Sequence, residues 1–233
     1  MIAGPYQVGA VAAGEGVSIG RVVAMAMILD PKRPWDPAVS EENLAHTAAC
    51  LFAMLHERRI PYVLVGGLAM LQYVEGRNTE DVDLILAAPS LSKLPELQIT
   101  GQELYFASGV FERLPVHVLL TRNPVFREVE RHYATTRRFA ESNVRCATVE
   151  GLLLLKLYAL PSLYRQGNFA RVSLYENDIA ILIHDYRPNL EPLLAELSGA
   201  LSETDLASLR EILVDIQQRL ERFENKHSGP EGQ

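Results

Sequence analysis

The stretch from residue 62 to residue 86 limits most strongly what this 233-residue chain can fold into. Tyr62 to Val65 is a short apolar run of strand-forming residues, bounded by a Gly-Gly pair at residues 66 and 67. Leu68 to Val74 has the apolar spacing of a short helix, and Val82 to Leu86 is a second apolar run. The stretch therefore predicts a strand, a glycine turn, a helix and a second strand in close succession.

Asp81 and Asp83 stand at the start of the second predicted strand, with one residue between them. Alternate residues of a strand point to one face, so both carboxylates should leave the same face of the sheet. Two such carboxylates repel each other unless a cation lies between them, and Mg²⁺ prefers oxygen ligands of this kind. Gly66 and Gly67 allow backbone N–H groups to approach phosphate oxygens. The four residues together predict a site for a metal-bound triphosphate.

Each part of this pattern also has a simpler interpretation. A Gly-Gly pair between a strand and a helix is more often plain turn chemistry than a phosphate cradle. An Asp-x-Asp sequence is common at solvated strand ends, where Asp83 would only cap a turn. The combination of strand, glycine pair, helix and Asp-x-Asp within one short segment favours the functional interpretation.

Two segments, Val65 to Ala69 and Arg77 to Leu84, resemble the signature of the DNA polymerase β-like nucleotidyltransferase superfamily. The likeness is strongest to its bacterial branch of abortive-infection and toxin nucleotidyltransferases, and it extends more weakly to Thr148 to Leu157 and Asp178 to Leu182. The resemblance implies that the two glycines hold the triphosphate and that the carboxylate pair binds Mg²⁺ (or Mn²⁺), with a third carboxylate on a later strand. It also implies transfer of a nucleoside monophosphate from an NTP to an acceptor, with release of pyrophosphate.

Two further residues become candidates for nucleotide binding through this resemblance. Lys156 interrupts an otherwise apolar helix, at a place where a basic residue can meet the triphosphate. A lysine that snorkels along the helix surface is an equally good interpretation. Thr79 precedes the second strand and could touch the substrate, although a threonine in a polar turn is ordinary. The toxin branch further implies an RNA acceptor such as tRNA, and an antitoxin-like protein partner.

The chain departs from the resemblance on the strand predicted over residues 116–120. The superfamily usually has an aspartate between apolar residues there, and this chain has His117. Imidazole nitrogen suits Zn, Ni or Cu better than Mg²⁺, so the change weakens a two-Mg²⁺ site. His117 could be a substituted metal ligand, act as a general base near neutral pH, or be a structural histidine in the cleft. Glu112 is a poor replacement because it should face the opposite side of an unbroken strand. The candidate catalytic residues are therefore Asp81, Asp83 and His117.

The charge and cysteine content limit the class of protein. A formal charge of −7 and a pI near 5.4 disfavour a wide electropositive surface, so an RNA acceptor would have to be held locally. Cys50 and Cys146 lie far apart in apolar stretches and are expected to be reduced core residues of a cytoplasmic protein. No run has the length of a membrane span and no export signal is expected.

The remaining pattern predicts an α+β fold, with a small mixed β-sheet nucleotidyltransferase core followed by a C-terminal helical subdomain. The predicted divisions are a poorly ordered or accessory arm, the core, the helical subdomain and a flexible tail, over residues 1–40, 41–147, 148–225 and 226–233. Apolar periodicity predicts helices over residues 40–59, 149–160, 174–184, 190–197 and 204–223, and further strands over 104–106 and 116–120.

Functions from different classes fit this sequence. The first is a metal-dependent, toxin-like nucleotidyltransferase, supported by the glycine pair and the carboxylate pair. The second is a catalytically degenerate nucleotidyltransferase-like protein that holds a nucleotide or a protein partner without transferring anything, and His117 favours it. A third, a helical interaction protein built on the long C-terminal helix, rests on periodicity alone. The enzyme is the favoured hypothesis.

Overall fold

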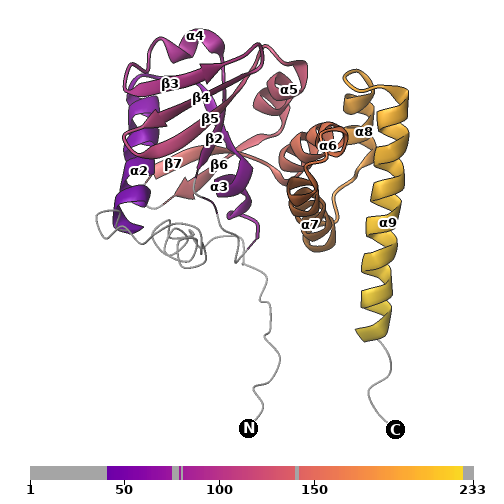
Figure 1. Cartoon of the computed structure of the whole chain (residues 1–233). Helices are drawn as coiled ribbons and strands as arrows, with labels where there is room; N and C mark the ends of the chain where they lie inside the picture. The colour runs from indigo at the N-terminus through magenta and orange to yellow at the C-terminus, as the bar shows by residue number, and fades with distance from the viewer. Residues whose placement is uncertain (1–40, 75–78, 80, 140–141, 228–233) are drawn as a thin grey trace, which may run out of the picture.

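The structure, a computed structural model, describes residues 41–74, 79, 81–139 and 142–227. The predicted arm, residues 1–40, and the tail from residue 228 lie outside the described residues. Figure 1 shows a sheet with its helices, followed by a group of helices that stands beside it. The α+β fold class predicted from the sequence is therefore confirmed. The division of the chain into separate domains remains a prediction.

One mixed sheet forms the first part, with strand order β3-β4-β5-β2-β1-β7-β6. β1 is antiparallel to β2, whereas β2 is parallel to β5 and β1 is parallel to β7. Antiparallel pairs complete both edges. The strand bounds are β1 Tyr62–Val65, β2 Val82–Leu86, β3 Leu97–Gln102, β4 Phe106–Phe111, β5 Leu114–Leu120, β6 Ala134–Phe139 and β7 Ser142–Ala147.

Helices cover both faces of this sheet (Figure 1). α2, Glu41–Glu57, lies on one face, where Phe52 stacks on Tyr62 of β1 with ring centroids 5.9 Å apart. α5, Pro124–His132, lies on the other face, where Phe126 meets Phe106 of β4 edge-on at 5.4 Å. The shorter helices α3, Gly66–Met70, and α4, Ala88–Leu91, follow β1 and β2. The face that carries α5 is the one on which the candidate site lies.

The second part is helical and is joined tightly to the sheet. Thr148 caps the first helix directly after β7, because its hydroxyl accepts the N–H of Gly151. A Cβ on Gly151 would lie 2.7 Å from the carbonyl oxygen of Tyr133, so the helix start is pressed against the core. The helix bounds are α6 Val149–Arg165, α7 Phe169–Tyr186, α8 Glu191–Ser198 and α9 Glu203–His227.

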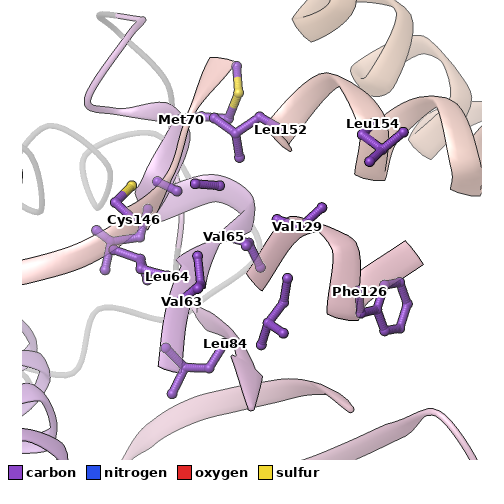
Figure 2. Packing of buried hydrophobic residues seen from close by; sticks show 14 of the residues in the cluster. Val63, Leu64, Val65, Met70, Leu84, Phe126, Val129, Cys146, Leu152 and Leu154 are labelled. Carbon is purple, nitrogen blue, oxygen red and sulfur yellow. The ribbon is translucent and has the colours of Figure 1, made fainter. Parts of the chain in front are cut away.

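A single cluster of buried apolar side chains connects the two parts. It includes Met70 of α3, Val129 of α5 and Leu152 of α6, together with the inner residues of β1 and β2 (Figure 2). Because the cluster is shared, the helices of the second part are fixed relative to the strands that carry the candidate site. None of the helices in the described parts is both long and apolar enough to span a membrane.

The predicted elements differ from the structure in a few places. β1 and β2 have the predicted bounds, α6, α7 and α9 include the predicted helices, and α8 begins one residue after its predicted start at residue 190. α3 begins at Gly66 itself, not at Leu68. Residues 104 and 105 form a bend before β4, so the strand predicted over 104–106 is wrong except at its last residue. Glu112 lies in the turn between β4 and β5 with φ 57°, where the Thr47 hydroxyl donates to it at 3.2 Å. The prediction that Glu112 continues an unbroken strand is therefore wrong.

Candidate active site

The candidate site lies where β1 ends and β2 begins, beside the middle of β5. Val65, the last residue of β1, is the antiparallel register partner of Asp83. Asp83 is in turn the parallel register partner of His117 on β5. Register partners project to the same face of a sheet, so Asp83 and His117 are neighbours on the face that carries α5. The chain leaves β1 at this point and turns through the two glycines into α3.

Gly66 lies directly against the carboxylate of Asp83. A Cβ added to Gly66 would lie 1.7 Å from Asp83 Oδ2 and 2.8 Å from Asp83 Cβ. The residue also has φ +65°, a conformation that side chains disfavour. A backbone hydrogen bond from Gly67 reaches the same carboxylate. The glycine turn and Asp83 therefore form one close-packed unit.

Thr79 connects the second glycine to Asp81. A Cβ on Gly67 would lie 2.4 Å from Thr79 Oγ1, and the Thr79 hydroxyl donates to Asp81 Oδ1 at 3.0 Å. Asp81 Oδ2 lies 3.6 Å from His117 Nε2, and both side chains are partly exposed. The fold thus gathers the following sequence-predicted residues at one place: Gly66, Gly67, Thr79, Asp81, Asp83 and His117.

The electrostatics of this place are dominated by the two carboxyl groups. Desolvation by the surrounding protein atoms, and then the negative charge of Asp81, raise the pKa of Asp83 to about 6. His117, the hydrogen bond from Gly67 and the charge of Lys156 act in the opposite direction. Because the charge of Asp81 raises the pKa of Asp83, the two carboxylates repel each other, and a cation placed between them would relieve that repulsion.

Lys156 of α6 is buried, and its charge is paired with α7. Its Nζ donates to Asp178 Oδ2 at 2.6 Å and lies 4.5 Å from the ring centroid of Tyr175. Only 6% of the Lys156 side chain is exposed, so the alternative prediction that it snorkels along the helix surface is wrong. Its positive charge acts to lower the pKa of Asp83.

The sequence did not predict that Asp178 and Tyr175 contact Lys156. The available signal was a single lysine in the apolar run of one helix, with a single aspartate on the apolar side of the next. Charged residues are rarely buried without a partner, so such a pair is expected to meet. The contact depends on the packing of α6 beside α7, which the sequence does not specify.

The side chains fit a metal ion that is bound together with its substrate. Among the described residues, no group of three or more His, Cys, Asp and Glu side chains could hold a metal ion. Asp81 and Asp83 supply two carboxylates, and Mg²⁺ typically binds one or two carboxylates and completes its octahedron with water and substrate phosphate. The donor set therefore fits Mg²⁺ or Mn²⁺ bound jointly with a triphosphate, and does not fit a metal cage made of protein alone.

Comparison with solved structures identifies the fold. No protein-family model matches the chain, and no curated protein matches it significantly in sequence. An antigenic nucleotidyltransferase-like protein from Paracoccidioides brasiliensis has a similar structure, with TM-score 0.53 and 21% identity over 78% of this chain and 94% of that one. ANT(2″)-Ia in complex with adenylyl-2″-tobramycin gives TM-score 0.48 and 14% identity over 71% of this chain and 97% of that one. The first of these similarities shows that the chain has the nucleotidyltransferase fold.

Proposed function

We propose that the chain is a metal-dependent nucleotidyltransferase that moves a nucleoside monophosphate from an NTP to an acceptor. The observation that carries the proposal is the close packing of Asp83 on Gly66, with Asp81 and His117 beside them. A glycine turn that packs next to two carboxylates suits a triphosphate and its cation. The nucleotidyltransferase fold supports the same activity.

Each residue has a distinct task in this proposal. Asp81 and Asp83 would hold Mg²⁺ or Mn²⁺, which neutralises negative charge on the phosphates when bound. Gly66 and Gly67, which lack a Cβ, would allow phosphate oxygens to approach the backbone beside Asp83, and Lys156 would add a positive charge that acts on the same carboxylate. The hydroxyl of Thr79 holds the carboxylate of Asp81 in place.

His117 is the candidate for the proton transfer. The acceptor oxygen forms a bond to the α-phosphorus, the bond from that phosphorus to the bridging oxygen breaks, and pyrophosphate leaves with its electron pair. The proton of the acceptor hydroxyl must go to a base, and a neutral imidazole next to the carboxylates can accept it. Nearly half of the His117 side chain is exposed, so an acceptor can reach it.

The biological setting is proposed from the sequence resemblance. We infer an RNA acceptor such as tRNA, held locally because the chain has a net charge of −7. A toxin-like role in the cytoplasm, with an antitoxin-like protein partner, follows from the same resemblance. Incubation of the protein with each labelled NTP, Mg²⁺ or Mn²⁺ and total RNA tests the acceptor and the activity together.

A second function is favoured by one observation. His117 occupies the register position next to Asp83, on the strand where the resemblance implies a third carboxylate. A catalytically degenerate protein that binds a nucleotide or a protein partner would retain the glycines and the carboxylate pair and lose the third carboxylate. It would bind Mg²⁺-NTP and would transfer nothing with either metal.

Calorimetry separates these functions from a purely structural role. The double variant Asp81→Asn, Asp83→Asn removes two negative charges with little change of shape, and it should lose Mg²⁺-dependent NTP binding. The control Glu211→Gln, Asp215→Asn removes two exposed charges from α9 and should bind as the native chain does. Equal NTP affinity in the native chain and in the site variant would refute the metal role, and therefore both functions.

A further inference from the structure

Tyr186, the last residue of α7, attaches the helical part to the core. Its hydroxyl donates to the backbone carbonyl of Tyr73 at 2.8 Å, across 113 positions of the chain. Its ring meets the ring of Tyr73 edge-on, with centroids 5.7 Å apart and planes at 88°. A hydrogen bond together with an edge-on aromatic contact fixes both the position and the direction of the end of α7.

The point of attachment is itself held rigidly. Tyr73 is buried, and its hydroxyl donates to the carbonyl of Ala147 at the end of β7 at 2.8 Å. The guanidinium of Arg137 lies 5.5 Å from the centroid of the Tyr73 ring. Contacts from β6, β7 and α7 thus converge on one residue, and Tyr186 is anchored to the sheet through it.

α7 connects this anchor to the candidate site. Tyr175 and Tyr186 are separated by three helical turns, so they lie on the same stripe of α7, about 16 Å apart along its axis. Two buried residues of that stripe, Ile179 and Leu182, pack into the core between them. At the site end, Tyr175 and Asp178 hold the ammonium of Lys156. A displacement of α7 at Tyr186 therefore also displaces the groups that hold Lys156.

We propose that Tyr186 is a positioning residue, which keeps α7 in the register that holds the ammonium of Lys156 against Asp178 and Tyr175. The inference rests on the proposed role of Lys156 in nucleotide binding. It extends the site to a residue that does not contact the carboxylates and that the sequence did not single out. It also gives the helical part a task in the reaction, because α6 and α7 together hold a buried positive charge that acts on Asp83.

The test is the variant Tyr186→Phe, which keeps the aromatic contact and removes only the hydroxyl. Mg²⁺-NTP should bind about fivefold more weakly, the equivalent of one hydrogen bond of ordinary strength. The matching NMP, which lacks the β- and γ-phosphates, should bind with unchanged affinity. The control Ser198→Ala also removes a hydroxyl from the helical part, one that donates to the carbonyl of Ala195 within α8, and should leave both affinities unchanged. An equal loss for NTP and NMP would overturn the inference.

A double-variant cycle shows whether Tyr186 acts through Lys156. Lys156→Gln removes the charge and keeps a donor for Asp178, and adding Tyr186→Phe to it should weaken NTP binding no further. Full additivity of the two losses would contradict the inference.

Amide hydrogen exchange tests the positioning role of Tyr186 even if the native chain binds no NTP. Absence of NTP binding would refute only the proposed function. Tyr186→Phe should then raise exchange rates over residues 174–182, and unchanged rates would refute the positioning role.

Discussion

Replacing Gly66 with alanine tests how closely the glycine turn and the carboxylate fit. The new Cβ would lie 1.7, 2.5 and 2.8 Å from Oδ2, Cγ and Cβ of Asp83, so that side chain would have to leave its position. The displaced carboxylate would lose the hydrogen bond from Gly67. The φ of +65° adds a backbone cost, because residues with a side chain rarely adopt it.

These effects set the size of the expected loss. The left-handed backbone costs about 1 kcal/mol, and overpacking costs roughly 1 to 3 kcal/mol. The free energy of unfolding should therefore fall by roughly 2 to 4 kcal/mol. Asp83→Gly removes all three clashing atoms, so in that background the alanine should cost only about 1 kcal/mol.

Urea unfolding of the four chains in this cycle measures the difference, and calorimetry measures Mg²⁺-NTP binding, which Gly66→Ala should abolish. Gly199→Ala is the control, because Gly199 has φ −82° and its Cβ would meet no atom closer than 3.8 Å. That variant should change stability by less than about 0.5 kcal/mol. An alanine that costs the same with and without Asp83 would refute the close packing on which the proposed site depends.

Two further predictions concern His117 and Asp83. His117→Asp should raise transfer with Mg²⁺ by adding an oxygen ligand. If the imidazole is the base, His117→Ala should abolish transfer. Incorporation of labelled nucleotide, measured with Mg²⁺ and with Mn²⁺, distinguishes both results from a native chain that transfers nothing. The raised pKa of Asp83, about 6, predicts that Mg²⁺-NTP affinity increases as the pH rises through that value. Because the pKa of Asp83 is raised from the ordinary 3.8 in the folded chain, protonation of Asp83 favours the folded state. This stabilisation is fully present below pH 3.8 and is lost as the pH rises from 3.8 to about 6. Asp83→Asn should remove this change, and a pH-independent stability difference between the two chains would contradict the shift.

The elements that the sequence predicts well are those with a local pattern. β1 and β2 are buried apolar runs with clear ends, and their predicted bounds are those of the structure. β3, β6 and β7 were not predicted. β3 and β6 are the two edge strands, and most of their side chains are exposed, whereas β7 lies between β1 and β6 and its Val144 and Cys146 are fully buried. An edge strand is specified by its pairing partner, and the arginines of β6 hide any apolar alternation.

The candidate site divides in the same way. Gly66, Gly67, Asp81 and Asp83 lie close together in the sequence, so their meeting follows from a turn and two short strands. The position of His117 depends on the parallel register of β2 with β5, which the sequence does not specify. The pairing of Lys156 with Asp178, and the anchor at Tyr186, depend on how α6 and α7 pack, which is long-range information.

The carboxylates of the site bear on the number of metal ions it can hold. Asp81 and Asp83 are the two carboxylates of the site, and Lys156 is paired with Asp178 at 2.6 Å. His117 brings no carboxylate, so the protein offers two carboxylates to metal ions. The resemblance implies two ions and a third carboxylate, and an aspartate in place of His117 would supply that missing oxygen ligand. The departure at His117 therefore changes the ligand type at the third position, and transfer by the His117→Asp variant with Mg²⁺ distinguishes a working transferase from a protein that only binds the nucleotide.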